Sequence, residues 1–112
     1  MHMIEAVIKP SALDAVKAKL SGLGILGVTA LECKGFGKQK GHTERYRGGR
    51  MDVGFVPKIL LKIACRSEDL QKTVDAIVAA ARTGKVGDGK LWVYRLDTVI
   101  RVRTGEKDND AL

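Results

Sequence analysis

Two short segments of the chain carry residue types and spacing that suit the binding of phosphate groups. The first, residues 83–90, reads TGKVGDGK and ends in Lys90. Its glycines can leave backbone N–H groups accessible to an anion, and the lysine can neutralise the anion's charge. The segment is one residue short of the P-loop pattern, because Leu91 stands where serine or threonine belongs. It would also lead from helix to strand instead of from strand to helix, so we reject a P-loop. A tight glycine turn without a ligand is the alternative.

The second segment lies near the carboxyl terminus. Arg101 and Arg103 are two residues apart in a stretch that alternates apolar and basic residues, 99–103. If this stretch is extended, both guanidinium groups lie on one face, as a pair that could clamp a phosphate. Solvated surface arginines are the alternative interpretation.

The most unusual part of the chain is a long basic segment, residues 34–58. It holds six glycines and seven lysines or arginines but only two acids, so it carries +5 of the net charge of +7. Loops in compact domains usually have ~4–6 residues, and those beyond ~12–15 are commonly functional or disordered. Gly35 and Gly37 flank Phe36 near its start. Two interpretations fit them: a close approach of the backbone to a ligand, or a plain bend at the end of a strand.

The elements that must position these segments follow from hydrophobic patterning. Apolar runs predict strands at 3–8, 25–32, 59–64 and 91–94, with a further short one at 99–103. Apolar residues at helical spacing predict two helices, one through Leu13, Val16 and Leu20 and one through Leu70, Val74, Ile77, Val78 and Ala81. Ser11 and Ser67 are their expected N-caps, and the polar tail at 105–112 is expected to fray.

The resulting order is β-α-β, a long loop, and β-α-β again. This is the order of the α+β, ferredoxin-like βαββαβ sandwich, with four antiparallel strands in one sheet and both helices on one face. The residues of the other face are largely apolar, so self-association is its expected cover. At 112 residues, the chain is expected to form a single domain over 1–112.

The composition narrows the function without choosing it. A net charge of +7 predicts attraction to anions such as nucleic acids, anionic lipids or small phosphates. No apolar run could span a bilayer and no signal-peptide pattern is visible, so a cytoplasmic location without direct membrane insertion is expected. Cys33 and Cys65 have no metal-ligand spacing and are expected to be free, buried thiols. No catalytic constellation is visible, so the protein is not expected to be an enzyme.

Four segments in this order resemble the PII family of signal-transduction proteins, the trimeric nitrogen and carbon sensors of bacteria, archaea and plants. They are KGFGKQKGHTERYRG at 34–48, FVPK at 55–58, TGKVGDGK at 83–90 and VIRVRTGE at 99–106. The resemblance covers about residues 4–105. It implies a ferredoxin-like homotrimer with three nucleotide sites between subunits, and it makes residues 37–55 the family's T-loop.

The resemblance also implies ligands and the residues that hold them. ATP or ADP would lie across the 83–90 turn, and Arg103→Ala should weaken ATP binding strongly. The nucleotide residues would be Gly27, Val28, Thr29, Gly35, Gly37, Lys38, Gln39, Gly87, Asp88, Gly89, Lys90, Arg101 and Arg103. Gln39 would hold Mg²⁺ beside the ATP phosphates, and 2-oxoglutarate would chelate that metal. The 2-oxoglutarate residues would be Gln39, Lys40, Gly41 and Lys58, with Lys58 pairing with its distal carboxylate.

The resemblance makes the tip of the T-loop the surface that contacts partners, and here the chain departs from the family. The residues concerned are Tyr46, Arg47, Gly48, Gly49, Arg50 and Met51. Met51 stands where many bacterial members carry a uridylylated tyrosine, and Gly49 where cyanobacterial members carry a phosphorylated serine. Neither modification is therefore expected at its usual place. Gly54 and Lys62 replace common acidic residues, and the one at 62 lies near the nucleotide in the family, which bears on ATP–ADP discrimination.

The leading hypothesis is therefore a trimeric PII-type sensor of ATP or ADP and, with Mg-ATP, 2-oxoglutarate. It would regulate a membrane transporter, such as an ammonium channel, or a metabolic enzyme of nitrogen or carbon metabolism, and could reach the membrane through that transporter. The alternative within the family is an adenine-nucleotide sensor without a 2-oxoglutarate response, acting on a different membrane transporter. A basic nucleic-acid-binding module is the competing class. Only 4% of residues are aromatic and no aromatic pair suits base stacking, so no nucleic-acid partner is expected.

Overall fold

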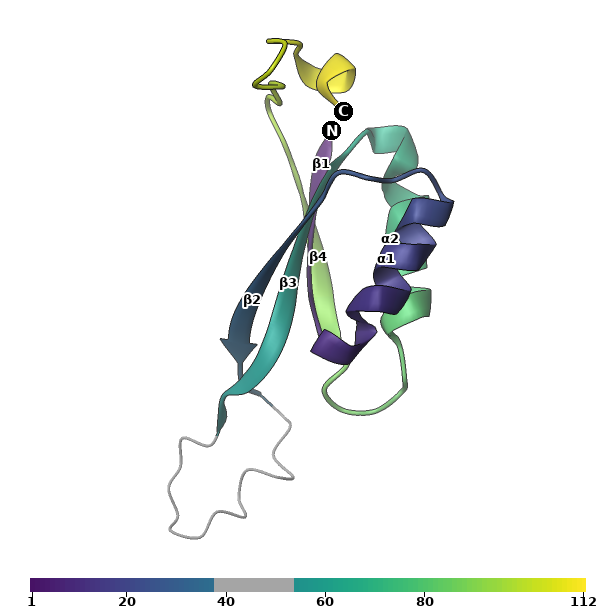
Figure 1. Cartoon of the computed structure of the whole chain (residues 1–112), viewed down its shortest axis with the longest axis vertical. Coiled ribbons are helices and arrows are strands. Elements are labelled where there is room, and N and C mark those ends of the chain that lie inside the picture. Colours follow the sequence, from purple (N-terminus) through teal and green to yellow (C-terminus); the bar gives the residue numbers. More distant parts are fainter. Residues whose placement is uncertain (38–53) are drawn as a thin grey trace, which may run out of the picture.

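The computed structural model describes residues 1–37 and 54–112. In these residues, the regular elements follow in the order β1 (His2–Ile8), α1 (Leu13–Gly22), β2 (Val28–Gly35), β3 (Val56–Cys65), α2 (Leu70–Ala81) and β4 (Gly89–Arg95). The strands pair antiparallel in one sheet with the order β2-β3-β1-β4. Both helices lie side by side on one face of this sheet (Figure 1). The predicted ferredoxin-like α+β fold is confirmed.

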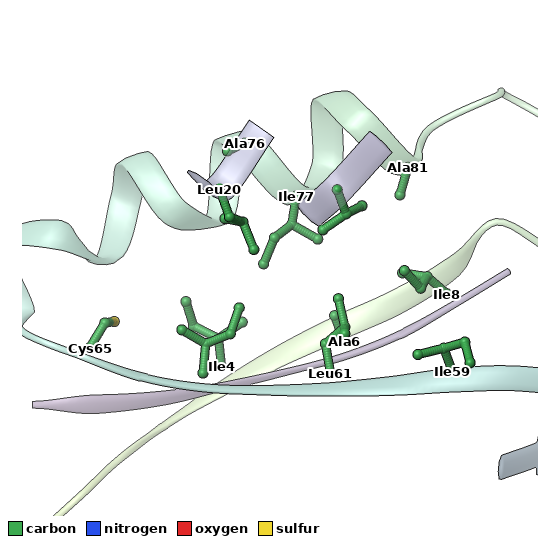
Figure 2. Packing of buried hydrophobic residues seen from close by; sticks show 12 residues of the cluster. Ile4, Ala6, Ile8, Leu20, Ile59, Leu61, Cys65, Ala76, Ile77 and Ala81 are labelled. Atoms are coloured by element: carbon green, nitrogen blue, oxygen red, sulfur yellow. The ribbon is translucent and has the colours of Figure 1, made fainter. Parts of the chain in front are cut away.

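The core lies between the helices and the inner face of the sheet. Every second residue of β1 and β3 is buried, as expected for strands with one face covered. Figure 2 shows Ile4, Ala6 and Leu61 pointing from the sheet toward Leu20 and Ile77 of the two helices. These five side chains are at most 1% exposed. The alternation in sequence thus fixes which face of each strand meets the helices.

The strand boundaries differ from the prediction where turns compete for backbone hydrogen bonds. β2 begins at Val28, three residues later than expected. The N–H of Ile25 instead donates to the carbonyl of Leu20 at 2.9 Å, so this part of the chain closes the end of α1. β2 and β3 then continue to Gly35 and Val56, which face each other across the sheet. The two strands therefore extend together to the ends of the long segment between them.

The predicted N-caps are wrong. Each α-helix is preceded by a short 3-10 helix, Pro10–Ala12 before α1 and Ser67–Asp69 before α2, and neither serine hydroxyl caps the helix. The Ser67 hydroxyl accepts instead a hydrogen bond from the amino group of Met1 at 3.2 Å. The cap residue is displaced because the 3-10 helices supply the first turn.

The predicted strand at 99–103 and the frayed tail are also wrong. The N–H of Gly105 donates to the carbonyl of Arg101 at 2.7 Å, so the chain reverses within this stretch and Ile100 forms only an isolated bridge with Lys107. The tail ends in a 3-10 helix, Asp108–Ala111, anchored by the Arg66 guanidinium on the carbonyl of Asn109 at 2.8 Å. Backbone and side-chain hydrogen bonds therefore order a segment whose composition is polar.

The outer sheet face, whose residues are largely apolar, also carries a polar row. By strand register, it carries Glu5 opposite Lys62 on one side and Trp92 on the other. Both cysteines are free as expected, Cys65 buried and Cys33 half-buried, and burial raises the pKa of the Cys65 thiol. Within residues 1–37 and 54–112, no helix is long and apolar enough to cross a membrane.

Candidate nucleotide and effector site

One hollow at an end of the sheet collects several of the residues predicted to bind ligands. It has a volume of about 650 Å³ and lies where the ends of β2 and β3 meet the turn between α2 and β4. Its lining consists of Val7, Gly35, Phe36, Gly37, Lys58, Val86, Gly87, Gly89, Lys90 and Trp92. Two lysine side chains and a glycine-rich backbone therefore face the same space, which suits an anionic ligand.

The 83–90 turn leads from helix to strand, which agrees with the rejection of a P-loop. Gly84, Gly87 and Gly89 have φ of +88°, +103° and +100°, a region that favours glycine. Asp88 holds the turn from within. Its carboxylate accepts hydrogen bonds from the hydroxyl of Thr83, from the N–H of Thr83 at 2.7 Å and from the N–H of Gly84 at 2.9 Å.

These bonds change the expected roles of two residues. The Gly84 N–H is engaged by the Asp88 carboxylate, so it is not free to receive an anion. The Asp88 carboxylate faces its own turn, and Lys9 lies 3.3 Å from it. The hydroxyl and N–H of Thr83 hold the pKa of the Asp88 carboxyl well below its usual range. The geometry makes Asp88 a residue that shapes the turn for Gly87, Gly89 and Lys90.

Asp88→Asn is therefore expected to lower the melting temperature at pH 7. Because the folded-state pKa of Asp88 is depressed, its contribution to stability is complete above the unfolded-state pKa of ~3.9 and is lost as pH falls toward the folded-state pKa. The difference in melting temperature between the wild type and the variant should become smaller below about pH 4. Thermal unfolding followed by circular dichroism from pH 3 to 7 measures this. Asp97→Asn, at an exposed carboxylate beyond β4, is the control; a gap of constant size across this range would contradict the assignment.

Lys58 connects the start of β3 to this turn. Its ammonium donates a 2.7 Å hydrogen bond to the carbonyl of Gly87, and the residue is only 7% exposed. A lysine this buried is uncommon without a partner, and a carbonyl is a neutral one. The ammonium therefore remains available to a carboxylate that enters the hollow and offers a full negative charge.

A pair of aromatic rings stands where the long segment leaves the sheet. Phe36 and Phe55 meet edge to face, with ring centroids 5.0 Å apart at an interplanar angle of 72°. A Cβ on Gly54 would lie 3.3 Å from the Phe36 ring. The absence of a side chain at position 54 thus accommodates this contact, a role that was not visible from the sequence.

Lys62, where an acidic residue is common in the resembling family, forms an ion pair with Glu5 at 3.6 Å. The same carboxylate accepts hydrogen bonds from the Trp92 indole N–H at 2.8 Å and the Tyr94 hydroxyl at 2.7 Å. The bonds from Tyr94 and then Trp92 lower the pKa of Glu5, and Glu5 raises that of Tyr94. Sequence reasoning missed Glu5 and Trp92. Their position on the outer face of adjacent predicted strands was the available signal.

Five other predicted nucleotide residues lie at the opposite end of the sheet: Gly27, Val28, Thr29, Arg101 and Arg103. β2 has eight residues, so seven steps of strand separate Val28 from Gly35 by about 23 Å. Gly27, Val28 and Thr29 therefore lie far from Gly35 and Gly37 of the same chain. The segment after β4 is likewise at the far end from the 83–90 turn (Figure 1). One copy of the chain does not bring these two groups together.

The two arginines of that far segment also differ from the predicted pair. Because the stretch folds back, they do not share one face of a strand. The Arg101 guanidinium binds the Glu106 carboxylate at 2.8 Å and the Ala111 carbonyl at 3.3 Å, whereas Arg103 is exposed. Arg103 is therefore the one of the two with its side chain open to a ligand outside this segment.

Comparison with known proteins decides the family. A family model described as nitrogen regulatory protein P-II matches residues 1–106. The chain belongs to the P-II family. Nitrogen regulatory proteins P-II of Rhizobium etli and Pasteurella multocida are each 50% identical to it over 112 residues, with full coverage of both chains. Those relatives are named as regulatory proteins, in keeping with the expectation of a non-enzyme.

A solved structure of Arabidopsis thaliana PII bound to citrate superposes on this P-II chain with a TM-score of 0.83 at 32% identity. The match covers 99% of this chain and 91% of the plant protein. The fold and the family expected from the sequence are therefore both confirmed.

Part of the predicted P-II site lies outside the described residues. This holds for Lys38, Gln39, Lys40, Gly41, Tyr46, Arg47, Gly48, Gly49, Arg50 and Met51. The predicted magnesium residue and all six predicted partner-binding residues are among them. Within residues 1–37 and 54–112, no group of three or more His, Cys, Asp or Glu side chains could hold a metal ion.

Proposed function

We propose that this P-II protein is a homotrimeric signalling protein that binds ATP or ADP in the hollow beside the 83–90 turn. With Mg-ATP bound, it binds 2-oxoglutarate at the same place. Residues 37–55, the T-loop, transmit ligand occupancy to a membrane transporter or a metabolic enzyme in the cytoplasm. Different ligands favour different loop conformations, and a partner that binds only one of them therefore binds only when the matching ligand is present.

The observation that carries this proposal is the separation of the predicted nucleotide residues into two groups at opposite ends of the sheet. Lys90, Gly87 and Lys58 lie at one end, and Thr29 and Arg103 at the other. A nucleotide that uses both groups must lie between two copies of the chain. A head-to-tail contact forms a ring when its rotation closes, and a ring of three copies would hold three such sites, one at each interface.

The chemistry of the hollow supports a phosphate and a carboxylate ligand together. Backbone at Gly87 and Gly89 with the Lys90 ammonium suits the phosphates, and the Lys58 ammonium, next to the Gly87 carbonyl, suits the carboxylate. The plant relative was crystallised with citrate, a polycarboxylate, which favours a carboxylate effector for this chain as well. Gln39 would hold Mg²⁺, which would supply positive charge for the phosphates and for the carboxylate effector.

One observation favours the alternative, an adenine-nucleotide sensor without a 2-oxoglutarate response. The Gly87 carbonyl holds the Lys58 ammonium at 2.7 Å, so an effector must approach its remaining N–H groups in this position or bear the cost of drawing the ammonium away from Gly87. If that cost exceeds the gain from the new ion pair, only the nucleotide binds. This sensor would then act on a different membrane transporter.

Titration calorimetry separates these possibilities. Titration with ATP and Mg²⁺ is expected to show saturable binding with up to three sites per trimer. A second titration with 2-oxoglutarate, in the presence of saturating Mg-ATP, is expected to show further heat, and none without the nucleotide. Heat from ATP but not from 2-oxoglutarate would establish the alternative. No binding of ATP or ADP would refute both sensors.

A further inference from the structure

Trp92 is the only tryptophan of the chain, and it takes part in both the Glu5 cluster and the ligand hollow. Its indole N–H is bound to Glu5 on the outer sheet face, and its side chain also lines the ligand hollow together with Lys90 and Lys58. It is 42% exposed, so a large part of the indole is accessible. None of the roles derived above uses this residue.

The cluster around Glu5 fixes the orientation of the indole. Glu5 lies directly opposite both Lys62 and Trp92 in the sheet register, so the three side chains share one row across β3, β1 and β4. A hydrogen bond from an N–H to a carboxylate is stronger and more directional than one between neutral groups, and this one measures 2.8 Å. Tyr94 donates to the second carboxylate oxygen from the next outward position of β4. The carboxylate is thus held from several sides and can serve as a fixed anchor.

Lys62 explains how a carboxylate can stand beside a site for anions. An unpaired negative charge one residue row away from Lys90 would oppose phosphate binding. The Lys62 ammonium, 3.6 Å from Glu5, offsets that charge locally. The row therefore supplies an anchor for the indole without adding net negative charge to the hollow.

We propose that Trp92 is an aromatic wall of the nucleotide site that contacts the bound nucleotide, and that Glu5 is the positioning residue that orients it. The inference rests on the proposed function, since it requires a nucleotide in this hollow. It adds a contact from the outer face of β4 and assigns the Glu5–Lys62 pair a part in ligand binding.

The single tryptophan provides a direct readout of this contact. Addition of Mg-ATP to the trimer should change the intensity or wavelength of Trp92 emission, with the same midpoint as the calorimetric titration. Trp92→Leu should weaken Mg-ATP by about tenfold or more, since contact of a base with an aromatic ring is worth roughly 1.4 kcal/mol or above. Trp92→Phe keeps an aromatic face, so its affinity for Mg-ATP should be close to that of the wild type. It is the control for a loss of binding in Trp92→Leu that comes only from a change in packing.

Two further variants test the positioning role of Glu5. Glu5→Ala should lower the fluorescence anisotropy of Trp92 in the free protein and reduce its emission change on Mg-ATP binding. Glu68→Ala, which removes an exposed carboxylate outside both the cluster and the hollow, is the control, and its Mg-ATP affinity should be unchanged. Calorimetric ATP binding with no emission change, and with wild-type affinity in Trp92→Leu, would overturn the inference and leave the proposed function intact. Absence of ATP binding would instead refute the proposed function itself.

Discussion

Gly89→Ala is expected to destroy the nucleotide site and to destabilise the sheet beside it. Gly89 is the first residue of β4 and pairs with Ile8 of β1. Its φ is +100°, and a Cβ at this position would overlap the backbone carbonyl of Val7. An alanine must therefore change its own backbone conformation or displace β1, and either movement disturbs the hollow that Val7, Gly87 and Lys90 line.

The cost of the steric overlap in Gly89→Ala can be separated from the cost of a positive φ alone. Placing a non-glycine residue in such a conformation costs roughly 1–2 kcal/mol. Gly84→Ala is the matched control, because Gly84 has φ +88° in the same turn but nothing lies within 4 Å of its would-be Cβ. Urea unfolding and ATP titration should show a modest loss of stability for Gly84→Ala. Both a greater loss of stability and loss of ATP binding are expected for Gly89→Ala. Equal effects in the two variants would show that the steric overlap with Val7 does not matter.

Lys58→Met is expected to weaken 2-oxoglutarate binding strongly while Mg-ATP still binds. Methionine has a similar length but removes the ammonium that faces the hollow. A hydrogen bond to a charged group contributes ~1.5–3 kcal/mol, so the affinity for 2-oxoglutarate should fall by about 10-fold to 100-fold. The Gly87 carbonyl also loses its partner, so a small loss of ATP affinity is expected from the loosened turn.

Calorimetry with and without 2-oxoglutarate, at saturating Mg-ATP, measures the effect of Lys58→Met. Lys85→Met is the control, since Lys85 is an exposed lysine of the same turn that does not line the hollow. Wild-type affinity for 2-oxoglutarate in Lys58→Met would mean that its carboxylates bind elsewhere.

The elements and their order were predictable because each rests on local periodicity. Alternating apolar residues in β1 and β3, and the stripe of Ile77 and its neighbours in α2, follow directly from one covered sheet face. The strand at 99–103 failed for the opposite reason. The alternating apolar and basic residues there have no neighbouring strand to pair with. The backbone instead forms hydrogen bonds within a chain reversal, which the bond from Gly105 to Arg101 closes.

The site was predictable in its residues but not in its geometry. The glycines and Lys90 of the turn are visible as a motif, whereas the inward orientation of Asp88 depends on where Thr83 and Gly84 place their N–H groups. Likewise, the bond from Lys58 to Gly87 joins residues 29 positions apart, which no spacing reveals. The division of the nucleotide residues between two ends of the sheet follows only from the strand register.

A site shared between subunits is tested most directly by mixing two defective chains. Lys90→Ala and Arg103→Ala are each expected to bind ATP weakly as pure proteins, because each removes a cation from every site. When the two are coexpressed with different affinity tags and mixed trimers are purified, some interfaces pair an intact Lys90 with an intact Arg103 from the neighbour. Every mixed trimer then contains one intact site among its three, so ATP binding of near wild-type affinity should return at about a third of the wild-type capacity. If both residues served a site within one chain, every site would keep one defect, and mixed trimers would bind ATP no better than their parents.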